Sequence, residues 1–233
     1  MLVLFDIDGT LLLTQRAGMN AMCDAGRELF GDSFTMDGVE FAGRLDCLIW
    51  LDLVRLNALE DTQANHDRFR TTYGLHLRRR LDTERKTLLL PGVGDLVQRL
   101  DAERGVTLGL LTGNYPETGR MKIASAGLDP NVFKVNAWGI DGRTRRDLPP
   151  VAMERHREHH GRSVAPEQVI IIGDTPHDVD CAKAHGCRSI GVATGVFTRE
   201  ALNDSGADLA VDDLSRTAEV LAWMLQTRAS VLQ

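Results

Sequence analysis

The sequence predicts an α/β protein with a parallel sheet flanked by helices and a small all-helical domain inserted after the first strand. Two observations lead to this prediction. In residues 87–233, short apolar segments alternate with amphipathic ones, a pattern typical of parallel sheets covered on both faces. Residues 14–86 instead place apolar side chains at helical spacing and contain no convincing strand. We therefore expect a core formed by residues 1–13 and 87–233 and a helical domain formed by residues 14–86.

The chain opens on residues 1–5, a continuous apolar run that is typical of a short strand buried on both faces. Three helices are expected to follow, over residues 14–30, 46–59 and 62–81, the first of them ending at Gly31. These three helices make up the predicted helical domain.

Beyond Pro91, predicted helices and strands alternate. The predicted strands cover residues 106–111, 133–137, 169–172, 189–192 and 209–211. The predicted helices cover residues 91–104, 116–127, 149–160, 178–185 and 214–227. In such sheets, ligands bind beyond the carboxyl ends of the strands, so the residues that follow each strand are the first candidates for a site.

Composition and charge argue against several classes of protein. The 233 residues carry a formal net charge of −6 with no strongly basic block, which argues against nucleic-acid binding. No run of about 18 apolar residues occurs, so we expect no membrane span. The first residues lack the pattern of a targeting segment. The four cysteines show no disulfide or metal spacing, and we expect reduced thiols in a cytoplasmic protein. The oligomeric state does not follow from the sequence.

Two carboxylates follow the first predicted strand. Asp6 and Asp8 are two positions apart, so in extended geometry their side chains share one side of the strand. Crowded carboxylates repel each other, and a divalent cation, a shared proton or exposure at the strand end would relieve that cost. Asp and Gly also form turns readily, so Asp-x-Asp-Gly-Thr could be a plain turn. Its position directly after a buried strand favours a catalytic site.

Polar residues also follow two later strands. Thr112-Gly113-Asn114 ends one of them, and Gly173-Asp174-Thr175-Pro176-His177-Asp178 ends another. A polar segment before the helix at 149–160 contains Arg143, Arg145 and Arg146. At one edge of a sheet, these residues would offer hydroxyl and amide groups for the oxygens of an anion and a guanidinium for its charge. Together with Asp6 and Asp8 they would also offer four carboxylates, which suit Mg²⁺.

These motifs resemble those of the haloacid dehalogenase superfamily, in its phosphoglycolate-phosphatase-like branch with a helical cap. The resemblance rests on Asp6-x-Asp8-Gly9-Thr10, Thr112-Gly113-Asn114, a basic residue, and Gly173-Asp174-Thr175-Pro176-x-Asp178, in this order along nearly the whole chain. It implies a Rossmann-like core, a helical cap domain and hydrolysis of a phosphate ester with the help of Mg²⁺.

The resemblance also implies roles for single residues. Asp6 would attack phosphorus to form an aspartyl-phosphate, and Asp8 would protonate the leaving group and then deprotonate water. Mg²⁺ would lie between Asp6, the backbone carbonyl of Asp8 and Asp174, with Asp178 as a ligand or as a partner of the ligands. The implied phosphate-binding residues are Gly9, Thr10, Thr112, Gly113, Asn114, Arg145 and Arg146.

The sequence departs from the family at the lysine that usually precedes the fourth motif. No lysine lies in the polar segment that should supply it. Arg145 is the first candidate to replace it and Arg146 the second, while Arg143 also remains possible. An arginine keeps the charge and adds bidentate reach. Residues 14–85 contain no lysine either, which argues against the phosphonate-cleaving branch, whose members need a cap lysine.

Two arginines of the predicted cap, Arg44 and Arg16, are candidates for substrate specificity. Arg44 resembles a residue of a substrate-facing loop and could bind a carboxylate or a second phosphate. It could equally pair with Asp46 or face solvent.

The predicted function is a Mg²⁺-dependent phosphatase for a small phosphorylated, phosphoglycolate-like metabolite. A sugar phosphomutase similar to β-phosphoglucomutase is the alternative, because it uses the same site and differs in the exclusion of water by the cap. A haloacid dehalogenase fits less well, since Asp8, Asp174 and Asp178 would have no cation to hold. A non-catalytic domain that binds a phosphorylated metabolite is the remaining alternative. No nucleic-acid or membrane partner is expected.

Overall fold

A computed structural model describes residues 1–230. Its centre is a six-stranded sheet with the order β5-β4-β1-β6-β7-β8, in which every neighbouring pair is parallel. The strands are β1 (Leu2–Phe5), β4 (Thr107–Leu111), β5 (Val135–Ala137), β6 (Val169–Gly173), β7 (Arg188–Val192) and β8 (Leu209–Val211). Phe5 at the end of β1 is in register with Leu110 of β4 and Ile172 of β6. The carboxyl ends of these three strands therefore meet at one edge of the sheet.

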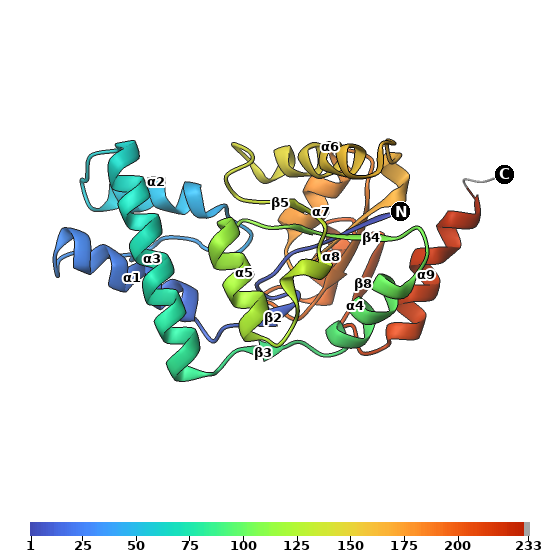
Figure 1. The fold of residues 1–233 in the computed structure, drawn as a ribbon, viewed down its shortest axis with the longest axis horizontal. Coiled ribbons are helices and arrows are strands. Elements are labelled where there is room, and N and C mark those ends of the chain that lie inside the picture. The colour runs from blue at the N-terminus through green and yellow to red at the C-terminus, as the bar shows by residue number, and fades with distance from the viewer. Residues whose placement is uncertain (231–233) are drawn as a thin grey trace.

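Helices cover both faces of the sheet. The side chains of β1 alternate between these faces, so its residues belong to two different buried clusters. Val3 and Phe5 share a buried cluster with α4 (Val93–Ala102), α5 (Pro116–Ser125) and α9 (Thr217–Ser230). Leu2 and Leu4 share another with α6 (Leu148–His160) and α7 (Pro176–Lys183). Figure 1 shows α6 on one side of the sheet and α4 with α9 on the other. The remaining helix of the core, α8 (Arg199–Asp204), lies against β7 and β8.

The chain leaves the core through β2 (Leu12–Leu13) and returns through β3 (Leu88–Leu89), which pair antiparallel. Between them lie α1 (Ala17–Phe30), α2 (Asp46–Leu56) and α3 (Gln63–Glu84), called the helical segment below. Their facing sides form a separate buried cluster that includes Met22, Trp50, Phe69 and Tyr73. Figure 1 shows the helical segment at one end of the molecule, where α3 lies beside α5.

The α/β fold class predicted from the sequence is confirmed, and each predicted helix and strand is present within a few residues of its expected limits. The strands β2 and β3 and the helix α8 were not predicted, because they are shorter than any periodic pattern. The helix expected from Pro91 begins at Val93, since Gly92 adopts a φ of 77° against the backbone of Leu214. Within residues 1–230, no helix is long and apolar enough to cross a membrane.

Candidate active site

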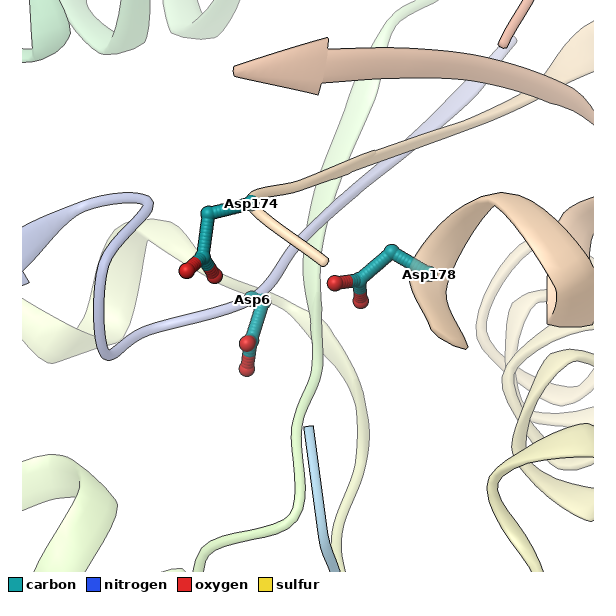
Figure 2. A group of neighbouring side chains, drawn as sticks. All are labelled: Asp6, Asp174 and Asp178. Atoms are coloured by element: carbon teal, nitrogen blue, oxygen red, sulfur yellow. The ribbon is translucent and has the colours of Figure 1, made fainter. Parts of the chain in front are cut away.

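Three buried carboxylates lie together at the carboxyl edge of the sheet. Asp6 directly follows β1, Asp174 directly follows β6, and Asp178 lies in the first turn of α7. One oxygen from each carboxylate lies within 4.8 Å of the other two. Figure 2 shows the three side chains converging from these separate elements. Because β1 and β6 are neighbours in the sheet, residues far apart in the sequence become neighbours at this edge.

The backbone around Asp174 approaches its side chain closely. Gly9 has a φ of +80°, which glycine adopts without steric cost, and a Cβ atom there would lie 2.4 Å from Oδ2 of Asp174. A Cβ atom on Gly195 would lie 1.7 Å from the same oxygen. Thr10 is fully buried, and its Oγ1 donates to Oδ1 of Asp174 at 3.3 Å. These contacts fix the direction in which the carboxylate of Asp174 points.

Asp178 is held by the start of its own helix. Pro176 occupies the first turn of α7, and Thr175 caps it. Oδ2 of Asp178 accepts hydrogen bonds from the Thr175 backbone N–H at 3.1 Å and from Thr175 Oγ1 at 2.7 Å. Oδ1 accepts from Arg145. Both carboxylate oxygens of Asp178 therefore already accept hydrogen bonds from the protein.

The three carboxylates concentrate negative charge at a buried site. Burial raises the pKa of Asp6 to about 6; Arg145 opposes the rise, while Asp178 and Asp8 add to it. Burial also raises the pKa of Asp174 to about 8, with repulsion from Asp6 and Asp178 adding to the effect. A cation between these oxygens would relieve the repulsion. The donor set is all carboxylate oxygen, so it fits a hard divalent ion such as Mg²⁺.

Arg145 is the basic residue that reaches this group. It lies in a short 3-10 helix, Arg145–Asp147, whose start is capped by Thr144. Its Nη2 atom lies 3.1 Å from Oδ2 of Asp6 and 2.5 Å from Oδ1 of Asp178. The side chain is only 7% exposed, so its charge acts through little intervening water. The first candidate for the missing lysine thus lies beside the predicted nucleophile.

The other two arginines of the polar segment are elsewhere. Arg146 is exposed, and its guanidinium pairs with Asp180 of α7 at 2.6 Å. Arg143 is also exposed, and only its backbone N–H is hydrogen-bonded, to Asp147. The structure does not bring Arg146 or Arg143 to the carboxylates, because consecutive residues of a helical turn point in different directions.

A second polar group surrounds Asp8. Lys122 Nζ donates to Oδ2 of Asp8 and to Oδ1 of Asn114, both at 2.6 Å. Asn114 Nδ2 donates to the same oxygen of Asp8 at 2.9 Å and to Oγ1 of Thr112, also at 2.9 Å. Thr112 is fully buried. The predicted Asp8, Thr112 and Asn114 are therefore brought together, and a lysine joins them.

The sequence analysis missed Lys122, although the sequence contained a signal. In α5 the buried residues are Thr118, Gly119, Lys122 and Ile123, which share one face of the helix. A single lysine on the inward face of a predicted helix is unusual, because lysine is almost never fully buried unless it is paired. A lysine at such a position predicts a buried partner of opposite charge.

A cavity of about 380 Å³ lies between the carboxylates and the helical segment. The core contributes its polar wall: Asp6, Asp8, Gly9, Gly113, Asn114, Lys122, Arg145 and Asp174. Residues 14–86 contribute large apolar side chains, namely Met19, Met22, Phe41, Ile49 and Tyr73, together with polar ones that include Arg16, Arg44 and Asp46. Thr10 and Thr112 are fully buried and are not part of its lining. Most of the charged lining residues therefore come from the core, called the polar wall below, and most of the large apolar ones from residues 14–86, called the apolar wall.

The two arginines predicted for specificity both line this cavity. Arg44 does not pair with Asp46; its Nη2 atom lies 2.6 Å from Oδ2 of Asp52. Arg16 is exposed and precedes α1 with a left-handed φ of 68°. Asp46, at the start of α2, instead accepts a hydrogen bond from the backbone N–H of Tyr115 at 3.1 Å.

Known proteins match both the sequence and the fold. The family model described as haloacid dehalogenase-like hydrolase matches residues 1–186. A phosphoglycolate phosphatase from Escherichia coli (strain K12) is 31% identical over 133 residues, which are 57% of this chain and 50% of that protein. The chain thus matches about half the length of this curated relative.

Two solved structures share the fold at lower identity. A hydrolase from Pseudomonas syringae has a TM-score of 0.68 and 19% identity, over 95% of this chain and 97% of that one. A putative β-phosphoglucomutase from Thermotoga maritima has a TM-score of 0.64 and 21% identity, over 95% and 98% of the two chains. At this identity the likeness concerns the fold alone.

Proposed function

This chain belongs to the haloacid dehalogenase-like hydrolase family, and on that basis we propose that it is a Mg²⁺-dependent phosphatase that acts on a small phosphorylated metabolite through an aspartyl-phosphate. The observation that carries the proposal is the group of Asp6, Asp174 and Asp178, whose oxygens lie within 4.8 Å of one another. Arg145 lies beside them. A reaction at a carbon–halogen bond would need no metal ion and would therefore leave these three carboxylates without a function.

In the proposed reaction, Asp6 and Asp8 have different tasks. A carboxylate oxygen of Asp6 attacks phosphorus, and the bond from phosphorus to the leaving oxygen breaks while that oxygen takes a proton from Asp8. Asp8 then removes a proton from the water that attacks the phosphoryl group, and the bond between phosphorus and Asp6 breaks. The products are an alcohol and inorganic phosphate.

We assign the Mg²⁺ ion to Asp6, Asp174 and the backbone carbonyl of Asp8. Asp178 would orient the group, since both of its oxygens already accept hydrogen bonds. When bound, Mg²⁺ offsets the negative charge of nucleophile and phosphate. Arg145 would neutralise the phosphoryl oxygens from the other side.

The remaining phosphate contacts would come from the loop that ends β4. Gly9, Gly113 and Asn114 line the cavity, and the backbone N–H of Gly113 would donate to a phosphoryl oxygen. The N–H of Gly9 already donates to Leu12, and the amide of Asn114 donates to Asp8 and Thr112. Thr10 and Thr112 would support these contacts from beneath, Thr10 through Asp174 and Thr112 through Asn114.

We further propose that residues 14–86 act as a cap domain over a catalytic core made of residues 1–13 and 87–233. The cavity supports this division, because most of its charged lining residues come from the core and most of its large apolar ones from residues 14–86. The cap would then select the alcohol part of the substrate. Phosphoglycolate is the first compound to test, given the name of the curated relative, with Arg16 and Arg44 as the candidates to bind its carboxylate.

The test is hydrolysis of 4-nitrophenyl phosphate, followed by a panel of phosphorylated metabolites that includes phosphoglycolate. We expect activity with Mg²⁺, loss of activity with EDTA, and a loss in Asp6→Asn of at least about 10³-fold, since the nucleophile is removed. Asp180→Asn is the matched control, because this aspartate of α7, whose side chain is 48% exposed, lies outside the carboxylate group. Undiminished turnover by Asp6→Asn would disprove the mechanism.

The same assay separates the alternatives. A phosphomutase would convert a hexose phosphate to its isomer with little release of phosphate. A dehalogenase would keep its activity in EDTA. A binding protein would retain a phosphorylated ligand without turning it over.

A further inference from the structure

Lys122 has surroundings that the proposed reaction leaves unexplained. Of the four lysines in the chain, Lys86, Lys134 and Lys183 are exposed, whereas Lys122 is 5% exposed. Removing an ammonium group from water is costly unless charged or polar partners replace the water. The contacts that compensate this cost indicate what the residue does.

Those contacts form a closed ring of three side chains. Lys122 binds Asp8 and Asn114 at 2.6 Å each, and Asn114 binds the same oxygen of Asp8 at 2.9 Å. Oδ2 of Asp8 therefore has two donors behind it. Within the described residues, Oδ1 of Asp8 accepts no side-chain hydrogen bond, and the Asp8 side chain is 44% exposed next to the cavity. One oxygen of Asp8 is therefore held by two donors, while the other has no side-chain donor among the described residues.

Residues of the helical segment lie close to the ammonium group of Lys122. A Cβ atom on Gly18 of α1 would lie 3.3 Å from Lys122 Nζ and 3.6 Å from the hydroxyl oxygen of Tyr73. Tyr73 of α3 is fully buried. Asp46 of α2 is the other carboxylate nearby, and the charge of Lys122 opposes the rise in its pKa. Nevertheless, the ion pair at hydrogen-bonding distance is with Asp8.

We propose that Lys122 is a positioning residue that holds Asp8 in the orientation needed to pass a proton to the leaving oxygen. This inference rests on the proposed function, because it presumes that Asp8 is the proton donor. Proton transfer requires the carboxyl oxygen to lie within hydrogen-bond reach of the atom that receives the proton. Hydrogen bonds to Oδ2 would keep the Asp8 side chain in one rotamer, with Oδ1 within reach of the leaving oxygen. Without these hydrogen bonds the side chain would be free to rotate.

The competing explanation is that Lys122 only neutralises buried carboxylates and so stabilises the fold. The two explanations differ in how the loss depends on the leaving group. A phenolate stabilised by a nitro group leaves without a proton, but an unsubstituted phenolate profits from one. Loss of a proton donor therefore slows phenyl phosphate more than 4-nitrophenyl phosphate, while general damage slows both equally.

The experiment compares Lys122→Met with the unchanged protein on these two substrates, which have nearly the same shape. The comparison uses kcat/KM, because it reports the transfer of the phosphoryl group to Asp6, in which the leaving group departs, and not the later hydrolysis of the aspartyl-phosphate, which is the same for both substrates. We expect kcat/KM for phenyl phosphate to fall by about 10²-fold, within the range for general acid catalysis, and kcat/KM for 4-nitrophenyl phosphate to fall by less than about fivefold. Lys122→Arg should restore part of the loss, and Lys134→Met, an exposed lysine of the core, should behave as the unchanged protein. Equal losses on the two substrates, or no loss on either, would overturn the proposal.

A second variant covers the case in which Lys122→Met does not fold. Gly18→Ala adds a methyl group 3.3 Å from Nζ and forces the ammonium group to shift. It should reproduce the selective loss on phenyl phosphate in weaker form, and an equal effect on both substrates would count against the proposal.

Asp8→Asn separates this inference from the proposed function. If Asp8→Asn shows the selective loss and Lys122→Met does not, the positioning role is wrong and the phosphatase mechanism stands. If Asp8→Asn lowers kcat/KM equally for the two substrates, Asp8 is not the proton donor. The positioning role of Lys122 and the proposed mechanism are then both wrong.

Discussion

Arg145 lies against Asp6, with 3.1 Å between Nη2 of the arginine and Oδ2 of the aspartate. The same guanidinium binds Asp178, so one cation bridges two carboxylates from β1 and α7. The side chains are 7%, 8% and 2% exposed for Arg145, Asp6 and Asp178. A buried cation shared by two carboxylates is not easily replaced, because both carboxylates would be left without their positive partner.

Arg145→Met should destabilise the protein by about 3–5 kcal/mol when Mg²⁺ is absent, because it leaves two buried carboxylates without their cation. Denaturant unfolding in EDTA measures this. Arg145→Lys should recover part of the stability but lose at least about tenfold in kcat, since a lysine cannot bind two carboxylates with a planar fork. Arg146→Met removes a surface pair and should cost less than about 1 kcal/mol. Similar losses for the two Met variants would contradict the assignment.

Mg²⁺ should stabilise the folded protein through the same carboxylates. Binding to the folded state alone raises the free energy of unfolding by about 2.7 kcal/mol at a concentration 100 times the dissociation constant. Thermal unfolding with MgCl₂ and with EDTA should show this as a higher midpoint in MgCl₂. Asp174→Asn should abolish the difference, whereas Asp180→Asn should retain it. An equal response of both variants to Mg²⁺ would place the ion elsewhere.

Asp46 should make stability depend on pH. Burial raises its pKa to about 7 in the folded protein, despite the opposing charge of Lys122, from 3.8 as an ordinary carboxyl. Between these values the folded state binds a proton that the unfolded state does not. Stability from this group is therefore complete below about pH 4 and decreases by about 1.4 kcal/mol per pH unit as the pH rises toward 7.

Asp46→Asn removes this titration and keeps an oxygen to accept the Tyr115 N–H. The variant should therefore gain about 2–3 kcal/mol relative to the unchanged protein between pH 5 and pH 8. Free energies of unfolding at both pH values measure the gain. Asp32→Asn, on the exposed surface after α1, is the control. A constant difference across this range would show that Asp46 does not take up the proton.

The apolar wall of the cavity should select the alcohol part of the substrate. Burying one methylene group gains about 0.8 kcal/mol, or about fourfold in binding, so kcat/KM should rise from methyl to butyl phosphate. Met19→Gln places an amide in this wall and should lower the butyl-to-methyl ratio by about fivefold. Met121→Gln is the matched control, because Met121 is also partly buried but lies outside the cavity. A ratio unaffected by Met19→Gln would mean that the alcohol part lies elsewhere.

Much of the fold could be predicted from the sequence, because its elements are long enough to show a period. The apolar run before Asp6 and the β-branched run before Gly173 became the adjacent strands β1 and β6. Their position also brought Asp6 and Asp174 together, since the carboxyl ends of parallel strands meet at one edge. The sequence ranked Arg145 above Arg146, but the contact of Arg145 with Asp6 and of Arg146 with Asp180 depends on the direction of a single turn, which only the structure shows.

Other parts of the site depend on contacts across the chain that no local pattern shows. Lys122 meets Asp8 over 114 positions of sequence. Arg44 pairs with Asp52, one of several acidic residues within its reach along the chain. The division of the cavity into polar and apolar walls arises only when the helical segment folds back on the core. Local sequence gives the chemistry of each side chain but not its partner.

The start of α2 is fastened to the core at two points. The backbone N–H of Asp46 donates to the carbonyl of Gly113 at 2.7 Å, and the carboxylate of Asp46 accepts from the backbone N–H of Tyr115. Gly113 has no room for a side chain there, because a Cβ atom would lie 1.9 Å from the carbonyl oxygen of Arg44. Swinging the helices away from the sheet would exchange these hydrogen bonds for hydrogen bonds with water, at a cost of about 0.5–1.5 kcal/mol each. The helical segment is thus fixed to the core next to Asn114, and separation of the two would be easiest on the side away from this attachment.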